Sequence, residues 1–256
     1  MTIDIAGEDF EVTADRGGVV DQILPASLSP GWHTITLTSE GSIPVTARLR
    51  VVPETASVGV ICDIDDTVMV TALPRPLLAA WNSFVRDEHA RAPVPGMAVL
   101  LDRLQREYPD APVIYLSTGA WNVTPTLSRF LSRHLFPRGP LLLTDWGPTH
   151  NRWFRSGRAH KRQNLARLAA EFPHVQWILI GDDGQHDETL YAELAMARPE
   201  SVRAIAIREL LAQEALLSGG RRHFDRTHNP IAIPWVSAPN GAGLASEFMK
   251  LNILSE

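Results

Sequence analysis

The chain has 256 residues, a mass of 28.3 kDa and a formal net charge of −5. Hydrophobic residues make up 45% and charged residues 21%, a globular composition that excludes disorder as the main state. The mildly acidic charge argues against a nucleic-acid partner, and the single cysteine, Cys62, excludes an intrachain disulfide and a zinc site with two or more cysteines.

Residues 1–54 are expected to form a small β-rich segment, a partial sandwich at most, because a complete sandwich needs about 100 residues. Apolar and polar residues alternate over 34–38 and 45–51, and the Ser-Glu-Gly-Ser stretch at 39–42 suits the turn of a hairpin. The N-terminus lacks a basic stretch followed by an apolar one, so no signal peptide is predicted and a cytoplasmic location is expected.

Residues 55–256 are expected to form one α/β domain with a mainly parallel sheet and helices on both faces. Continuous apolar runs, typical of strands buried on both faces, occur at 58–62, 113–116, 141–143, 177–180 and 202–207. Helical spacing of apolar residues occurs over 97–104, 127–135 and 165–172, with Thr124 and Pro125 as the expected N-cap and first helical position of the second helix. No apolar run approaches the roughly 20 residues that span a bilayer. In such a sheet, ligands bind outside the carboxyl ends of the strands.

Polar clusters follow three of these apolar runs. They are Asp63-Ile64-Asp65-Asp66-Thr67, Ser117-Thr118-Gly119 and the stretch from Gly181 to Asp187. Carboxylates brought this close repel one another and require a cation, and their oxygens suit Mg²⁺. The plainer interpretation of residues 63–67 is an acidic turn or helix cap. An EF-hand is excluded, since Val68 and Pro74 stand where it needs Gly and Glu.

The order of these clusters resembles the haloacid dehalogenase superfamily of phosphotransferases. The flanking residues resemble its actin-patch-type phosphatidate phosphatase family over about residues 55–210, and less fully to the C-terminus. The residues that carry the closer resemblance are 63–67, 95–97, 136–143, 160–161, 180–185, 234–236 and 238–241. The resemblance implies a haloacid dehalogenase-like Rossmannoid fold and, because only 27 residues separate Thr67 from Pro95, no large cap domain over the site.

The resemblance implies a role for each residue of the first cluster. Asp63 would be the nucleophile that forms an aspartyl-phosphate. Asp65 would protonate the leaving-group oxygen and then deprotonate the attacking water. Thr67 would fix the loop by hydrogen bonds, and Asp66 is expected to be exposed or structural.

Four further residues are expected to hold the substrate phosphoryl group. Ser117 would donate its hydroxyl, together with backbone N–H groups around Thr118 and Gly119. Lys161 is one of only two lysines in a chain that otherwise uses arginine, and it is expected to open the helix over 161–172. A compact ammonium there suits a phosphoryl group and the nucleophilic carboxylate, although a solvated lysine is the plainer alternative.

The metal is expected to be Mg²⁺, held by Asp63, the backbone carbonyl of Asp65, Asp182 and a second acid of the last cluster. The Gly-Asp-Asp-Gly-Gln-His-Asp stretch at 181–187 favours Asp187 for that acid, with Asp183 as the alternative. The resulting activity would be that of a phosphatidate phosphatase, releasing phosphate and diacylglycerol. A phosphatase of a soluble phosphomonoester and a non-catalytic phospholipid- or phosphate-binding module remain as alternatives.

The substrate partner is therefore expected to be an anionic phospholipid, with peripheral contact to the membrane surface. The loop from 145 to 160 places Trp146 and Trp153 beside arginines, which suits a lipid interface. Packing of these aromatic residues on the sheet, with the arginines bound to carboxylates, explains the loop equally well. Docking by the N-terminal segment is a further hypothesis, whereas His223 and His228 are expected to be structural or exposed, and Cys62 to be a buried apolar residue.

Overall fold

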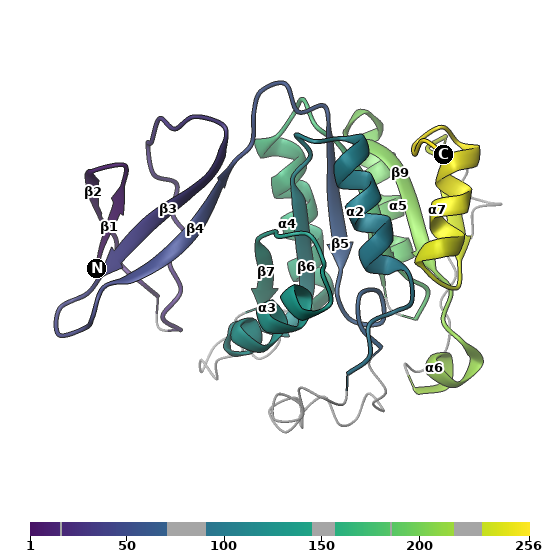
Figure 1. Cartoon of the computed structure of the whole chain (residues 1–256), viewed down its shortest axis with the longest axis horizontal. Coiled ribbons are helices and arrows are strands. Elements are labelled where there is room, and N and C mark those ends of the chain that lie inside the picture. The colour runs from purple at the N-terminus through teal and green to yellow at the C-terminus, as the bar shows by residue number, and fades with distance from the viewer. Residues whose placement is uncertain (16, 71–90, 145–156, 185, 218–231) are drawn as a thin grey trace.

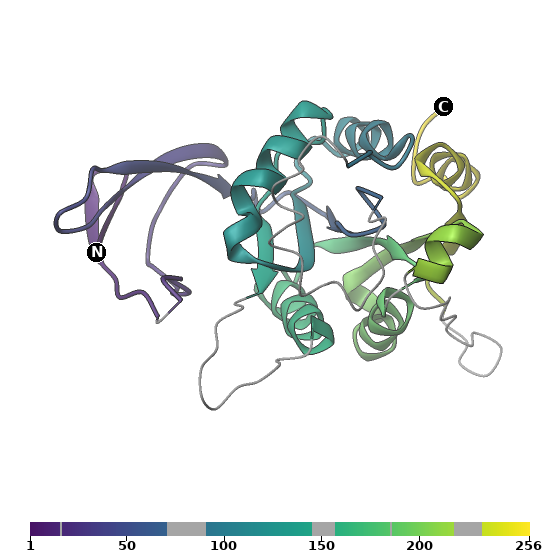
Figure 2. The ribbon, with the colours of Figure 1, turned by 90° about the horizontal axis from the view of Figure 1, so that it is seen from below.

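The computed structural model describes residues 1–15, 17–70, 91–144, 157–184, 186–217 and 232–256. Figure 1 shows an antiparallel sheet at the N-terminus and a second, larger sheet covered by helices. The first sheet has the strand order β2-β1-β3-β4, and the second has the order β10-β9-β8-β5-β6-β7. The N-terminal sheet lies on the β7 side of the larger one (Figure 1, Figure 2).

The N-terminal sheet contains the predicted hairpin. Its strands are β1 (Thr2–Ile5), β2 (Glu8–Glu11), β3 (Gly31–Thr38) and β4 (Val45–Val51). β3 and β4 pair antiparallel with Leu37 opposite Val45, which confirms the turn between them. β1 and β2 form a second hairpin that was not predicted, and Ile3, Ile5 and Val12 make a small buried cluster.

The larger sheet has six strands, and every pair of neighbours is parallel as predicted. The strands are β5 (Val58–Asp63), β6 (Val113–Ala120), β7 (Leu141–Thr144), β8 (Gln176–Asp182), β9 (Val202–Arg208) and β10 (Trp235–Ala238). The first five match the five apolar runs, whereas β10 was not predicted. One boundary was wrong: β6 continues beyond Leu116, so Ser117, Thr118 and Gly119 lie within its last part and not after it.

Helices cover both faces of this sheet (Figure 2). The helices are α2 (Met97–Glu107), α3 (Thr124–Arg133), α4 (Gly157–Glu171), α5 (Asp187–Ala197), α6 (Ala212–Leu217) and α7 (Gly241–Lys250), with short 3-10 helices η2 (Trp121–Val123) and η3 (Pro199–Ser201). One core lies between the sheet and α2, α3 and α7, and the other lies between the sheet and α4 and α5. Within the described residues, no helix is long and apolar enough to cross a membrane.

Three details of the helices differ from the prediction. Thr124 is the first residue of α3 and not its cap, and its hydroxyl donates to the carbonyl of Trp121, the first residue of η2. Leu135 lies past the end of α3 with a φ of 60° and is 82% exposed, so it does not extend the apolar face. Lys161 does not open α4, which includes Gly157 and places Lys161 in its second turn.

Candidate active site

The site begins at the carboxyl end of β5, the centre of the parallel sheet. Asp63 is the last residue of this strand and is buried. Its Oδ1 lies 2.7 Å from Lys161 Nζ, and its Oδ2 accepts a hydrogen bond from the Thr67 hydroxyl at 3.3 Å. Asp63 is thus oriented by a cation on one side and by its own loop on the other.

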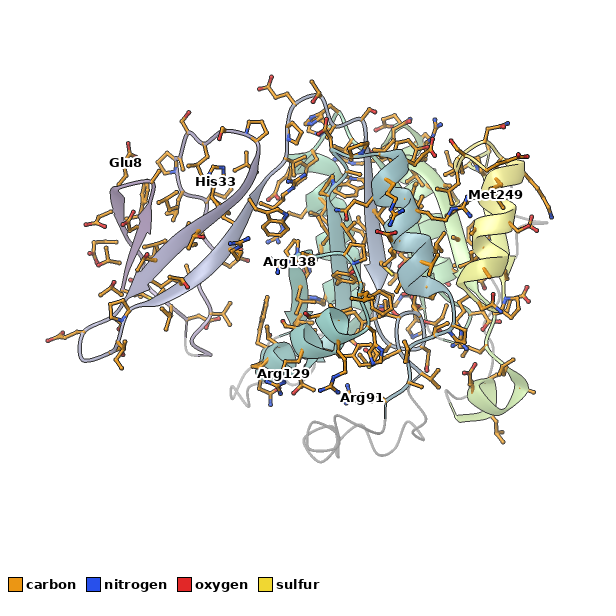
Figure 3. All side chains as sticks on the ribbon, viewed as in Figure 1. Glu8, His33, Arg91, Arg129, Arg138 and Met249 are labelled. Atoms are coloured by element: carbon orange, nitrogen blue, oxygen red, sulfur yellow. The ribbon has the colours of Figure 1, made fainter. Side chains whose placement is uncertain are left out.

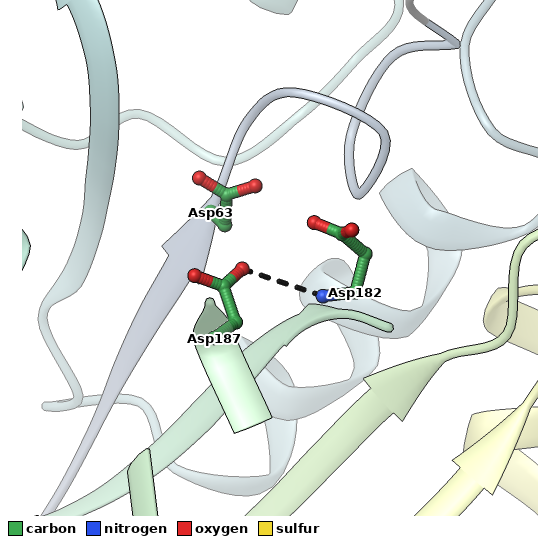
Figure 4. A group of neighbouring side chains, drawn as sticks. All are labelled: Asp63, Asp182 and Asp187. Carbon is green, nitrogen blue, oxygen red and sulfur yellow. Dashed lines mark hydrogen bonds between the residues drawn. The ribbon is translucent and has the colours of Figure 1, made fainter. Parts of the chain in front are cut away.

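Two further carboxylates face Asp63. Asp182 ends β8, Asp187 begins α5, and one carboxylate oxygen from each lies within 4.8 Å of the others and of Asp63 (Figure 4). The backbone N–H of Asp182 donates to Asp187 Oδ2 at 3.4 Å. Gly181 allows this approach, because a Cβ at that position would lie 2.5 Å from Asp187 Oδ2.

Burial and mutual repulsion set the protonation of this acidic cluster. Burial raises the pKa of Asp63 well above its ordinary value, and Lys161 opposes that rise while Asp187 and Asp65 add to it. Burial also raises the pKa of Asp182, and the charges of Asp187 and Asp63 raise it further. The described residues around these carboxylates therefore stabilise their negative charge only in part, which favours binding of a cation.

Lys161 supplies one positive charge to the cluster. It is 3% exposed, and its Nζ lies 2.6 Å from Asp187 Oδ1 as well as 2.7 Å from Asp63 Oδ1. Burial disfavours the charged ammonium, but the two carboxylates outweigh that cost and raise the pKa of Lys161. The plainer interpretation of Lys161 as a solvated surface residue is wrong.

The three carboxylates have the chemistry of a divalent metal site. Hard, anionic oxygens are the ligands that Mg²⁺ prefers, and buried carboxylates that repel one another are stabilised by a dication. Asp63, Asp182 and Asp187 satisfy both conditions from three separate elements. The residues of the site therefore fit a divalent cation.

Asp65 lies beside Ser117 at the end of the neighbouring strand. The Ser117 hydroxyl donates to Asp65 Oδ2 at 2.9 Å and accepts from the Gly119 N–H at 2.9 Å. The end of β6 is further fixed by Thr144, whose hydroxyl donates to the Thr118 carbonyl at 2.9 Å. Asp65 and Ser117, predicted from distant parts of the sequence, are in direct contact.

Two acids in the clusters have structural contacts of their own. Asp183 Oδ1 accepts a hydrogen bond from the Leu210 N–H at 2.9 Å, which turns this carboxylate toward the end of β9. Asp66 is buried, which rules out the exposed alternative. It adopts a φ of 58°, in the left-handed region.

Two arginines near the Asp63–Thr67 loop were not singled out from the sequence. Arg91 is buried with its Nη1 3.4 Å from Met69 Sδ, and its charge is close enough to Asp65 to interact with it. Figure 3 shows Arg91 at the edge of the sheet where the strands end. Arg208 contacts the carbonyl of Asp66. Arginine supplies all but two of the 24 basic residues, so composition marks neither one.

Several predictions concern segments outside the described residues. These are the aromatic part of the loop from 145 to 156, the span 71–90 and the two histidines His223 and His228. Arg158, at the described end of that loop, pairs with Glu193 at 3.0 Å. Cys62 is buried in the main core as predicted, and burial raises the pKa of its thiol.

The parallel six-stranded sheet, with helices on both faces and a buried acidic cluster at its carboxyl edge, defines an α/β domain with a candidate metal site. Residues 58–209 match the family model described as the catalytic domain of phosphatidate phosphatase APP1. The match covers more than half of the chain, so the chain belongs to this family.

Two curated fungal proteins are similar to the chain. One is phosphatidate phosphatase APP1 of Saccharomyces cerevisiae, 28% identical over 153 residues, which are 59% of this chain and 26% of that protein. The other is the uncharacterized protein C29B5.04c of Schizosaccharomyces pombe, 28% identical over 223 residues, 80% of this chain and 35% of that protein. The chain thus spans about a quarter to a third of the length of these relatives.

Solved structures show a more distant likeness. An uncharacterized protein from Listeria monocytogenes serotype 4b has a TM-score of 0.45 and 11% identity, covering 76% of this chain and 98% of that one. CbbY from Rhodobacter sphaeroides in complex with phosphate has a TM-score of 0.41 and 13% identity, covering 73% of this chain and 95% of that one.

Proposed function

We propose that this chain is a Mg²⁺-dependent phosphatase with an aspartate nucleophile, and that its substrate is phosphatidate. The observation that carries the proposal is the buried group of Asp63, Asp182 and Asp187 with Lys161, located where β5 and β8 end. Ser117 and Asp65, in hydrogen-bond contact beside it, complete the set of groups that phosphoryl transfer needs. Family membership supports the substrate.

Asp63 and Asp65 divide the reaction into two displacements. A carboxylate oxygen of Asp63 forms a bond to phosphorus while the bond from phosphorus to the ester oxygen breaks. Asp65 gives its proton to that departing oxygen. In the second step, Asp65 takes a proton from water as the water oxygen attacks phosphorus and the bond from phosphorus to Asp63 breaks. The second step regenerates both carboxyl groups and releases inorganic phosphate.

The remaining polar residues hold the phosphoryl group during both steps. The Ser117 hydroxyl and the N–H groups of Thr118 and Gly119 would bind its oxygens, and Thr67 holds the nucleophile in place. Lys161, already against Asp63, would share its ammonium with the incoming phosphate. Such preorganised charge is typically the largest contribution to catalysis of phosphoryl transfer.

The carboxylates of Asp63, Asp182 and Asp187, with the carbonyl of Asp65, would hold the Mg²⁺. The ion, when bound, would neutralise these carboxylates and polarise the phosphoryl group. Asp183 is a less suitable ligand, because the carboxylates that converge are those of Asp63, Asp182 and Asp187, whereas Asp183 Oδ1 binds the Leu210 N–H. A cytoplasmic protein that meets the membrane surface peripherally fits a phospholipid substrate.

Phosphate release from phosphatidate in mixed micelles tests the proposal. The measurement includes Mg²⁺ or EDTA, a panel of soluble phosphomonoesters, and the variants Asp63→Asn and Asp65→Asn. We expect Mg²⁺-dependent release from the lipid that both variants lose, while Lys250→Met, a change of the other lysine, keeps it.

The other outcomes separate the alternatives. Release only from soluble esters would reject phosphatidate but keep the aspartate mechanism. Release that Asp63→Asn retains would reject the nucleophile. Absence of release from every substrate, with lipid binding unaffected by Asp63→Asn, would favour a binding module over an enzyme.

A further inference from the structure

Arg208 occupies an unusual place at the end of β9. The residue is 2% exposed, and its guanidinium contacts three separate segments of the chain. Nη1 donates to the Asp66 carbonyl at 2.8 Å, and Nε donates to the Pro239 carbonyl at 3.3 Å. Nη2 donates to both carboxylate oxygens of Glu214, at 2.8 and 2.7 Å. A buried guanidinium with this many partners is held in one orientation.

The contact with Asp66 reaches the loop that carries the reacting groups. Asp66 lies between Asp65 and Thr67, and its φ of 58° is uncommon for a residue other than glycine. Such a conformation is unfavourable for a residue with a side chain and persists only where the surroundings impose it. Here the Asp66 N–H donates to the Met69 carbonyl at 2.8 Å, and Arg208 binds the Asp66 carbonyl. Arg208 thus stabilises the turn that orients Asp65 and Thr67.

Glu214 in turn holds Arg208. Its carboxylate accepts two bonds from Nη2 and one from the Leu211 N–H at 2.8 Å, in the turn that begins α6. The side chains of Arg208 and Glu214 are 3% and 13% exposed, so solvent screens this pair far less than a surface pair. The short helix α6 is thereby linked through one arginine to the loop of Asp63.

The backbone of Arg208 contacts the second acidic loop as well. Its carbonyl accepts from the Asp183 N–H at 3.1 Å, and Asp182 lies opposite it in the register of β8 and β9. The Leu210 N–H donates to Asp183 Oδ1 at 2.9 Å. The end of β9 therefore contacts both loops from which the carboxylate cluster is built.

We propose that Arg208, oriented by Glu214, is a positioning residue that fixes the Asp63–Thr67 loop for phosphoryl transfer. Arg208 would touch neither substrate nor metal and would act only through the Asp66 carbonyl. The proposal rests on the phosphatase function proposed above.

Arg208→Lys and Glu214→Gln test this role in the full-length protein. Lysine keeps the charge, but its donors share one nitrogen and cannot reproduce the spread of the three guanidinium nitrogens over the three segments, and glutamine weakens the hold on the guanidinium. We expect kcat to fall, for Arg208→Lys on the order of 10²-fold, because small misplacement of reacting groups costs that much. KM for the substrate should stay within about twofold, since no group that binds the substrate is removed.

Hydrogen exchange of the peptide covering residues 63–70 gives a readout that does not need activity. We expect faster exchange there in Arg208→Lys, because the backbone bonds of this turn, such as Asp66 N–H to the Met69 carbonyl, are loosened. Arg162→Lys is the matched control: Arg162 binds Glu193 through two nitrogens at 2.7 and 2.9 Å, but it is half-exposed on α4. Tyr108→Phe, which removes a hydrogen bond to the Ile253 carbonyl, calibrates the effect of lost stability alone.

The combination of outcomes decides the proposal. The proposal is supported if kcat falls, KM is unchanged and hydrogen exchange becomes faster only in residues 63–70. Unchanged exchange in residues 63–70, or activity that falls only as far as in a Tyr108→Phe protein of equal stability, would overturn it. If the wild-type protein releases phosphate from no substrate, the phosphatase function itself is rejected, and exchange alone then decides whether Arg208 holds the loop.

Discussion

Single residues at the site are constrained by charge and by space. Lys161 lies between Asp63 and Asp187, and removing one partner from a buried ion pair typically costs about 3–5 kcal/mol because a charge is left uncompensated. Gly181 lies so close to Asp187 that no larger residue fits without moving it. Substitutions of Lys161 and of Gly181, even small ones, are therefore expected to affect activity strongly.

Lys161→Met is expected to lower kcat by roughly 10²–10³-fold, the usual effect of losing one preorganised charge at a reacting group. The thermal midpoint should fall too, because Asp63 and Asp187 lose their shared cation. Lys250→Met, at the other lysine, removes an exposed pair with Glu247 and should change neither quantity measurably. Equal activity of the two variants would contradict the assigned role of Lys161.

Gly181→Ala is expected to weaken Mg²⁺ activation by roughly 10–100-fold, because its methyl group displaces the Asp187 carboxylate. The measurement is the Mg²⁺ concentration that gives half-maximal activity. Gly59→Ala is the matched control, since its Cβ would lie 2.5 Å from Trp177 Cζ3, inside the core and away from the acids. The control should lower stability but leave the Mg²⁺ requirement unchanged; the same shift in both variants would argue against displacement of Asp187.

At the scale of elements, the site is a consequence of strand order. β5 pairs with β6 on one side and β8 on the other, so the residues at the carboxyl ends of the three strands meet at one edge. The first turn of α5 carries Asp187 and Glu188 at the positive end of the helix dipole, where acidic residues are favoured. α7 lies on the other face of the sheet, in the core that it shares with α2 and α3, whereas α5 belongs to the second core.

Asn240→Ala tests that separation. The Asn240 side chain caps α7 by accepting a hydrogen bond from the Gly243 N–H at 3.0 Å. Its loss should cost about 0.5–2 kcal/mol, or a few degrees in the thermal midpoint for a chain of this size. We expect kcat to remain at the wild-type value when it is measured well below that midpoint. A large loss of kcat would show that α7 is coupled to the site.

In the whole molecule, the proposed site belongs to only one of the two sheets. Every proposed site residue lies between Asp63 and Asp187, in the parallel sheet and its helices, whereas residues 1–54 form the separate antiparallel sheet. An exposed pair, Arg167 with Asp21 at 3.3 Å, links the N-terminal segment to α4. We therefore propose residues 1–54 and 55–256 as two domains, with catalysis in the second.

Deletion of residues 1–52 should leave kcat for a soluble phosphomonoester within about twofold of the full-length value, since an exposed ion pair contributes little. Binding to vesicles that contain phosphatidate, measured by sedimentation, tests the role of the segment itself. Reduced binding would support docking by the N-terminal sheet, whereas unchanged binding would reject it. Loss of folding on deletion would contradict the division into two domains.

The sequence by itself determined the kinds of elements and the class of fold. The apolar runs of β5 through β8 are continuous, and that of β9 is interrupted only by Arg203, because both faces of these strands are covered; that pattern needs no knowledge of neighbours. Acidic residues directly after such runs predicted where the site lies. β10 has the same length as β7 but lacks its row of three leucines, because Ser237 interrupts the apolar residues, and the helix boundary at Thr124 has no distinct local pattern.

Only the tertiary structure decided which side chains meet. Asp183 and Asp187 are equally acidic in the sequence, but α5 turns Asp187 toward Asp63 while Leu210 binds Asp183. The contacts of Ser117 with Asp65 and of Arg208 with Asp66 join residues 52 and 142 positions apart. Local spacing carries no information about such pairs, because their distance is set by strand order, register and the packing of helices on the sheet.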